Sequence, residues 1–353
     1  EGERAKNGGT AYSELHEREI DFGDFRPRGP YATSETLANY FRAFKYIDLL
    51  RLNDEERRSL ADKPELVAAW KSWIDVQAPY LSGTRYEGLF GDGWARSPHV
   101  LPACLPTSVR ENPKRVFPLS WGRDSEILER VTAHDDLPAE CTVPQRVVPS
   151  GLDLLTGLGS PHALAIQRAE YARWPQLEAA HGAVRQRFSG DVPSDRFVDA
   201  WLRLVQILGN DTNTPEGVSP DVWHRRLMET ALASWTSFRH TTVLVNEGTA
   251  AQMGAGGDPI FEELGTEPIR GAVDPVPAAW AQLGRLLAGL SASAQASPTT
   301  DRVGEVLATA ATAASSFGSM AERQQRGEPL TEDEYRHIHD YAGTIEHPYL
   351  LLS

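Results

Sequence analysis

Apolar residues recur at helical spacing in two segments of the N-terminal third of the chain. The first segment holds them at three- and four-residue steps, at Leu37, Tyr40, Phe41, Phe44 and Ile47. The second repeats the pattern at Val67, Trp70, Trp73, Ile74 and Gln77, before Pro79. This period is typical of one face of an α-helix, and the turn Thr33-Ser34-Glu35 offers a hydroxyl that can cap the first of these helices. We therefore expect two amphipathic helices, the first of about four turns.

The second half of the chain has longer helical signals. Ser219 and Pro220 form a start signal, and neither glycine nor proline interrupts the chain again before Gly248. This predicts one helix of about seven turns. Residues 278–325 are rich in Ala, Leu and Ser and predict two further helices, joined near Ser297-Pro298-Thr299. Thr331 to Glu334 match a capping box that opens a last helix.

Residues 79–125 lack any sustained period and are rich in Gly, Pro and aromatic residues, which indicates a long ordered loop region. No strand pattern exceeds a few residues. The expected fold is thus mainly α, an irregular multi-helix domain with long ordered Gly- and Pro-rich loops. We expect residues 1–30 to form an extended N-terminal arm and residues 31–353 a helical domain, with a possible internal boundary near 145–150.

Charge and hydropathy narrow the classes of partner. The 353 residues include 35 basic and 49 acidic side chains, a formal net charge of -14, and no run of Lys and Arg occurs. Nucleic acid and anionic membrane surfaces are therefore not expected partners. No stretch of about 18 consecutive apolar residues is present, so we expect no membrane span.

The cysteines and histidines give no metal-binding pattern. Cys104 and Cys141 lie in Pro-containing segments without CxxC spacing, so they form either one disulfide or two free thiols. His337 and His339 are two residues apart on a predicted helix and face different ways, so they do not chelate one ion together. We expect no metal and no cofactor.

Five segments together carry a resemblance to a known family. They are FRPRGPY at 25–31, SWGRDSEIL at 120–128, SGLDLLTGLGS at 150–160, ETALASWTSFRHTTVL at 229–244 and PLTEDEYRHIHDYAGTIE at 329–346. Their order and spacing resemble the DUF3160 family, which has no established function. Many of its members look secreted or lipid-anchored, which implies an extracellular, periplasmic or cell-surface location.

The chain departs from the family pattern in two ways. Pro30 stands where the family turn usually has His, and Thr242 lies near an expected Asp, so an activity of the family, if it has one, is in doubt here. The family pattern also extends beyond both ends of this chain, which therefore looks like an excised middle. We expect association with another polypeptide, or with other fragments of the same precursor, through residues near Phe22–Tyr31 and His347–Leu352.

Arg239 and His240 stand side by side within the long predicted helix, on a face that begins apolar. In the structural interpretation, Arg239 pairs with a carboxylate such as Asp153 or Asp124, because a buried unpaired charge is costly. In the functional interpretation, Arg239 holds an anion and His240 acts as general acid or base. Arg28 and Tyr31 would then contribute to the same site.

Arg123, Asp124 and Ser125 precede an apolar run. The simplest expectation is that Asp124 or Ser125 caps a helix and that Arg123 is its exposed neighbour. The candidate binding residues are Arg28, Tyr31, Arg123, Asp124 and Asp153. No GxSxG elbow occurs. The expected function is a non-catalytic, secreted or surface-associated helical subunit that associates with other polypeptide segments, with a hydrolase centred on Arg239 and His240 as the alternative.

Overall fold

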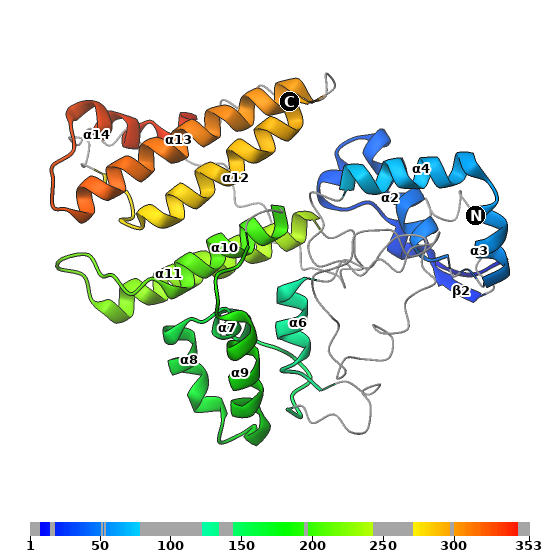
Figure 1. The fold of residues 1–353 in the computed structure, drawn as a ribbon, viewed down its shortest axis with the longest axis horizontal. Helices are drawn as coiled ribbons and strands as arrows, with labels where there is room; N and C mark the ends of the chain where they lie inside the picture. The colour runs from blue at the N-terminus through cyan, green and yellow to red at the C-terminus, as the bar shows by residue number, and fades with distance from the viewer. Residues whose placement is uncertain are drawn as a thin grey trace. The chain divides into compact units, whose positions relative to one another are not determined.

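The structure is a computed structural model of the chain, shown in Figure 1. It describes residues 8–14, 18–50, 52, 54–77, 122–133, 144–193, 197–242, 271–296 and 300–344. These residues are mainly helical and contain one two-stranded sheet, which confirms the mainly α, irregular multi-helix fold. The predicted loop region lies outside them from residue 79 to 121.

The chain divides into two compact units. The first comprises residues 1–210 and 228–244, and the second residues 211–227 and 245–353. The boundary predicted near 145–150 falls inside the first unit.

The first unit begins with a small hairpin. Strand β1 (Thr10–Ser13) pairs antiparallel with β2 (Arg18–Asp21), and the 3-10 turn η1 (Phe22–Phe25) follows at once. A small apolar core holds these elements together, made of Ile20, Phe22 and Phe25. Residues 1–30, predicted as an extended arm, therefore contain paired strands and a helical turn in their described part.

Three helices follow the hairpin: α2 (Glu35–Asp48), α3 (Asp54–Ala61) and α4 (Pro64–Gln77). The Ser34 hydroxyl accepts a hydrogen bond from the Leu37 backbone N–H at 3.2 Å, so it satisfies one of the free donors of the first turn. Both helices expected in this part of the sequence, and the cap at Ser34, are confirmed.

The main core of the first unit joins helices from its middle and its end. These are α6 (Arg123–Glu129), α7 (Gly151–Gly157), α8 (Pro161–Gln167), α9 (Pro175–Phe188), α10 (Phe197–Asn210) and the C-terminal part of α11 (Pro220–Thr242). Their apolar faces bury one cluster, to which α6 gives Ile127, α7 gives Leu154 and Leu155, and α11 gives Ala231 and Phe238. The core therefore fixes α6, α7 and α11 around one another.

Four small residues of the segment SGLDLLTGLGS have a clear structural role. Ser150 caps α7. A Cβ atom at Gly157 would lie 2.7 Å from the Ile127 side chain of α6, so glycine allows the two helices to approach. Gly159 has a φ of +107°, which an L side chain rarely adopts. Ser160 then caps α8.

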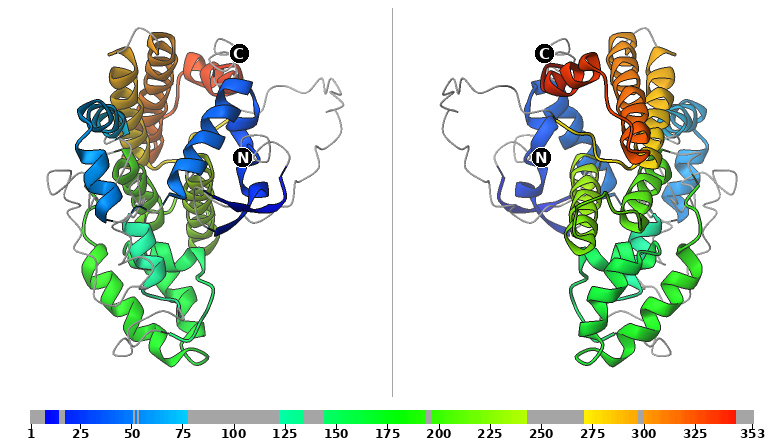
Figure 2. Two further views of the ribbon diagram at one scale, coloured as in Figure 1. Left: turned by 90° about the vertical axis from the view of Figure 1, so that its right-hand side faces the viewer. Right: turned by 90° about the vertical axis from the view of Figure 1, so that its left-hand side faces the viewer.

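The second unit contains a long helical hairpin. Helices α12 (Pro277–Gln295) and α13 (Asp301–Gln325) pack along each other, as Figures 1 and 2 show. The short helix α14 (Glu332–His339) starts at a capping box in which Thr331 and Glu334 bind each other's backbone N–H groups. The two helices predicted in 278–325 and the final capped helix are confirmed.

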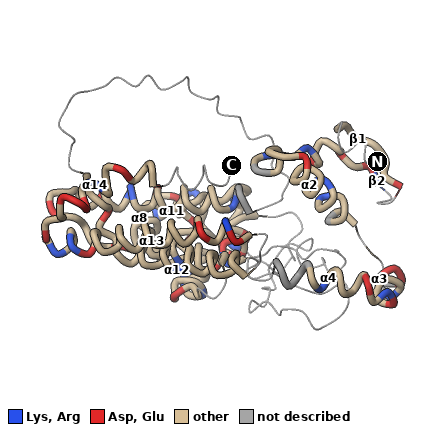
Figure 3. The backbone as a smooth tube through the Cα atoms, turned by 90° about the horizontal axis from the view of Figure 1, so that it is seen from above, with Lys and Arg blue, Asp and Glu red and all other residues tan. Residues whose placement is uncertain are grey.

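Charge is unevenly distributed along α13. Its Asp, Glu, Lys and Arg residues lie near its two ends, and the stretch between Glu305 and Glu322 carries none (Figure 3). Small residues in this stretch allow α12 to approach closely. A Cβ atom at Gly284 of α12 would lie 3.3 Å from the hydroxyl of Ser315 in α13. A neutral, small-residue surface suits the close packing of two helices.

Candidate functional site

Arg239 of α11 binds the carboxylate of Asp124, near the start of α6. Its Nε donates to Oδ2 and its Nη2 to Oδ1, each at 2.5 Å. The indole Nε1 of Trp235 also donates to Oδ2, at 2.9 Å. Asp124 is buried and the Arg239 side chain nearly so. The predicted pairing of Arg239 with a carboxylate is confirmed, and the partner is Asp124, not Asp153.

The start of α6 differs from the prediction. Gly122 is the N-cap residue, and Asp124 points inward to Arg239 instead of capping the helix. A Cβ at Gly122 would lie 2.7 Å from Asp124 Oδ1, so glycine leaves the space that the buried carboxylate needs. Arg123, expected to be exposed, is largely buried, and its Nε lies 3.5 Å from Asp199 Oδ1. Neither Asp124 nor Ser125 is the N-cap residue, although the Ser125 hydroxyl takes part in the cap by accepting from the Gly122 backbone N–H at 3.4 Å. The prediction of an exposed Arg123 is wrong.

Glu126 is a second buried carboxylate on α6, which the sequence analysis missed. Its Oε1 accepts from Arg130 Nε at 2.9 Å and lies 3.0 Å from Arg187 Nε of α9. Asp124 and Glu126 thus direct two charges of one short helix into the protein, and each charge has an arginine partner. These pairs satisfy the buried carboxylates, which is what burial of charge requires.

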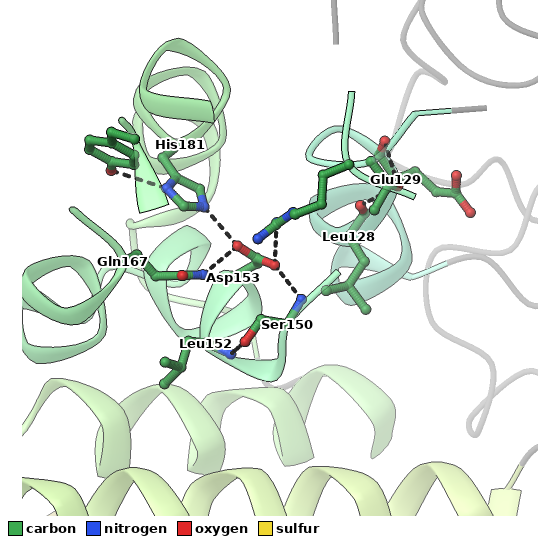
Figure 4. A network of polar contacts seen from close by, with 10 residues as sticks. Leu128, Glu129, Ser150, Leu152, Asp153, Gln167 and His181 are labelled. Atoms are coloured by element: carbon green, nitrogen blue, oxygen red, sulfur yellow. Dashed lines mark hydrogen bonds and ion pairs between the residues drawn. The ribbon is translucent and has the colours of Figure 1, made fainter. Parts of the chain in front are cut away.

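Asp153 lies at the centre of the densest polar network (Figure 4). Its Oδ2 accepts from Arg146 Nη2 and from the Ser150 backbone N–H, each at 2.5 Å. Its Oδ1 accepts from Gln167 Nε2 at 2.5 Å and from His181 Nε2 at 2.8 Å. The carboxylate is fully buried, and four donors from three segments converge on it.

The charge state of Asp153 follows from these partners. Burial alone would raise the pKa of its carboxyl group, but hydrogen bonds from His181, Arg146 and Ser150 outweigh it and hold the pKa below its ordinary value. Asp153 is therefore ionised at neutral pH, and its charge ties the start of α7 to the end of α8 and the middle of α9.

The network continues from Asp153 toward the surface. His181 Nδ1 lies 3.0 Å from the Tyr171 hydroxyl. Because ionised Asp153 only accepts, we assign the proton of the neutral imidazole to His181 Nε2, and Nδ1 is then the atom that can accept from the Tyr171 hydroxyl. Burial, followed by the charge of Glu178, raises the pKa of Tyr171, so the phenol is protonated at neutral pH. The result is a directed chain from Tyr171 through His181 to Asp153.

Asp153 was a candidate binding residue, but the sequence analysis did not identify its partners Arg146, Gln167 and His181. One signal was present: His181 occupies a helical stripe of α9 that otherwise holds Leu177, Val184 and Phe188. A histidine within a buried apolar stripe needs a polar partner, and Asp153 is that partner.

Arg28 and Tyr31 lie beside α2. Arg28 is exposed, and Tyr31 lies in the turn η2 (Gly29–Ala32). The Tyr31 ring packs on Phe41, with 5.4 Å between ring centroids, and on Tyr40. Burial, and to a lesser degree Tyr40, raises the pKa of Tyr31. Phe22, the first residue of the predicted contact segment Phe22–Tyr31, is fully buried and offers no surface to a partner.

Several predicted features lie outside the described residues. These are Cys104, Cys141, the segment His347–Leu352 and the side chain of His240. Within the described ranges, no three His, Cys, Asp or Glu residues gather closely enough to hold a metal ion. In the same ranges, no helix combines the length and apolarity that crossing a bilayer requires.

Among the described residues, the most exposed large apolar side chains adjoin the Asp153 network. Val147 is 77% exposed and Val148 is 73% exposed. They stand between Arg146 and Ser150, the two residues that bind Asp153 Oδ2. The Arg146 carbonyl also accepts from the Ala133 backbone N–H at 2.9 Å. The two valines are therefore exposed to solvent on a segment whose backbone is anchored on both sides of them.

Comparison with known proteins gives one match. The family model of DUF3160, described as a protein of unknown function, matches residues 114–351. The match confirms the family resemblance for the four motifs between residues 120 and 346, whereas FRPRGPY at 25–31 lies outside it. It includes Asp124, Asp153 and Arg239 with their partners. No curated protein and no solved structure matches the chain.

Proposed function

The chain belongs to the DUF3160 family, and we propose that it is a non-catalytic helical subunit that binds another polypeptide. The observation that carries this proposal is the pair Val147 and Val148, two adjacent valines exposed on a segment anchored to the buried Asp153. Large exposed apolar side chains that stand singly need no explanation, but adjacent ones on a fixed segment are typical of contact sites.

The non-catalytic part of the proposal rests on how the charged groups are used. Arg239 commits Nε and Nη2 to Asp124, and Asp153 accepts from four donors. A residue that holds a substrate or moves a proton for it needs donors or acceptors directed at that substrate. The same groups here stabilise the packing of helices, so the hydrolase alternative around Arg239 and His240 has less support.

The binding part rests on preorganisation. Ordering a loop at an interface costs free energy, and a segment already fixed in the free protein avoids most of that cost. Arg146 and Ser150 fix the backbone on both sides of the valines through Asp153. The chain carries a formal net charge of -14, so the surface that suits it is apolar at the centre with neutral or basic residues around it.

The location is also a proposal. We infer that the subunit works outside the cytoplasm, at the cell surface or in the periplasm or medium. This inference rests on the family resemblance, and the oxidation state of Cys104 and Cys141 tests it.

The experiment compares native protein with the double variant Val147→Ser/Val148→Ser by size-exclusion chromatography with light scattering. We expect the native protein to form a complex with a second chain, which mass spectrometry identifies, and we expect the double variant to elute at 38.9 kDa. The variant should keep its melting temperature, because the replaced side chains are exposed.

The matched control is Val222→Ser, since Val222 is 64% exposed on α11 and lies in the second unit. This variant should retain the complex. A native protein that remains monomeric at high concentration with no second chain, or a double variant that assembles as well as the native protein, contradicts the proposal.

A further inference from the structure

The chain from Tyr171 through His181 to Asp153 has a feature that helix packing does not require: it ends on a hydroxyl near the surface. We propose that Tyr171 is a modification site whose phenol oxygen accepts an acyl group from an activated ester or thioester, with His181 as the general base. This inference does not depend on the binding role proposed for Val147 and Val148.

The direction of the hydrogen bonds carries the proposal. Asp153 Oδ1 lies 2.8 Å from His181 Nε2, and His181 Nδ1 lies 3.0 Å from the Tyr171 oxygen. The carboxylate fixes the imidazole so that, in the neutral ring, the unprotonated Nδ1 faces the phenol. This is the arrangement in which a base takes the proton of a hydroxyl nucleophile while a third group orients the base.

The two ends of this hydrogen-bonded series differ in their exposure to water. His181 and Asp153 are fully buried, so the base and the carboxylate that orients it are shielded from water. Tyr171 is only half-buried, and its neighbours Ala172 and Arg173 are exposed. A small acyl donor therefore reaches the tyrosine but not the histidine, which makes Tyr171 the acceptor of the acyl group.

The electrostatics around Tyr171 require such a base. Burial raises the pKa of Tyr171, so the phenolate is scarce at neutral pH, and the proton must leave as the new bond forms. The charges of Arg168 and Arg185 act in the opposite direction and lower the pKa of Tyr171. They favour the negative charge that develops on the phenol oxygen during attack.

The step balances without an oxidant or a metal. The Tyr171 oxygen forms a bond to the acyl carbon, and the bond from that carbon to the alkoxide or thiolate leaving group breaks. The leaving group departs with the electron pair. The phenol proton passes to His181 Nδ1, and the imidazolium is stabilised by ionised Asp153 until the proton passes to the departing alkoxide or thiolate. The product is an O-acyl tyrosine.

The test uses the full chain and 4-nitrophenyl acetate as the acyl donor. We expect a burst of 4-nitrophenolate equal to the amount of protein, with one acetyl group that peptide mass spectrometry assigns to Tyr171. Acetylation of Tyr171 should be about 100-fold faster than that of Tyr341, although Tyr341 is 52% exposed. Tyr171→Phe should abolish the burst, and the matched variant Tyr341→Phe should retain it.

The role of His181 needs a measurement that does not depend on a variant at a buried position. The wild-type burst should be slower in D2O than in H2O, because the base removes the phenol proton as the bond forms. Retention of the burst in Val147→Ser/Val148→Ser separates this inference from the proposed binding role. A burst that survives Tyr171→Phe, equal rates at Tyr171 and Tyr341, or the absence of a solvent isotope effect would overturn it.

Discussion

Arg239 binds both carboxylate oxygens of Asp124 across a sequence separation of 115 residues. The contact joins the first turn of α6 to α11, and the Trp235 indole shares the same carboxylate. A bidentate arginine pair fixes orientation as well as distance. The pair therefore specifies how these two helices of the first unit meet, a constraint that the apolar contacts of Ile127 and Phe238 alone do not impose.

Replacing Arg239 with Met should destabilise the protein. Methionine keeps most of the side-chain length but leaves Asp124 buried without its guanidinium partner, which costs on the order of 3 kcal/mol in the free energy of unfolding. Denaturant unfolding followed by circular dichroism measures the difference.

The control for Arg239→Met is Arg336→Met, which removes an ion pair with Asp333 at 2.8 Å on the surface. Because both of its partners are largely exposed, we expect a change below about 1 kcal/mol. Equal stability of wild type and Arg239→Met would show that the buried pair with Asp124 contributes nothing to folding.

Asp153 should make stability depend on pH in the acid range. Its pKa in the folded protein lies below the ordinary value of 3.8, so ionised Asp153 contributes stability at every pH above that value. The contribution is lost as the pH falls through the lower, folded-state pKa. The difference in unfolding free energy between wild type and Asp153→Asn should thus shrink as the pH is lowered below about 4.

Urea unfolding of wild type and Asp153→Asn from pH 5 to pH 2 tests this dependence. Asp333→Asn serves as the control, because Asp333 is exposed on α14 and forms a surface ion pair with Arg336; its difference from wild type should change little with pH. A difference for Asp153→Asn that stays constant to pH 2 would contradict the expectation.

The sequence predicted the helices better than the polar contacts between them. Periodicity and capping signals are local, so Ser34, Pro220 and the Thr331–Glu334 box located helix starts correctly. Asp124 was misassigned because a polar residue before an apolar run looks the same whether it caps the helix or turns inward. The choice depends on Arg239, which only the tertiary fold brings near.

The Asp153 network shows the same limit. Ser150 is a neighbour in sequence, and its place at the start of α7 was visible, but Gln167 and His181 reach Asp153 from two other helices. No local pattern encodes that convergence. The Tyr171 hydroxyl could be found only after the tautomer of His181 had been assigned from its contact with the carboxylate.

Cys104 and Cys141 should be joined if the protein is exported. A disulfide between them would restrain the intervening segment and stabilise the protein by about 3 to 4 kcal/mol in the chain-entropy treatment. Thiol counting under denaturing, non-reducing conditions decides the question, with the reduced protein as the reference. Two reactive thiols in native material would indicate a reducing compartment and contradict the proposed location.

Two glycine-to-alanine variants should change stability in opposite directions. At Gly157, the new methyl group would lie 2.7 Å from Ile127 Cγ2 and 3.0 Å from its Cδ1. Both residues lie in the core that joins α7 to α6, where neighbours have little room to move. Overpacking of this kind costs about 1 to 3 kcal/mol, so Gly157→Ala should lower the midpoint of urea unfolding.

Gly182 of α9 is the matched control, because a Cβ there would meet no atom within 4 Å. Alanine removes the entropy penalty of a glycine inside a helix, so Gly182→Ala should raise the unfolding free energy by about 0.5 to 1 kcal/mol. The substitution is identical in both variants, and only the distance between α7 and α6 distinguishes them. If Gly157→Ala were as stable as Gly182→Ala, the close approach of Gly157 to Ile127 would not be a constraint on the fold.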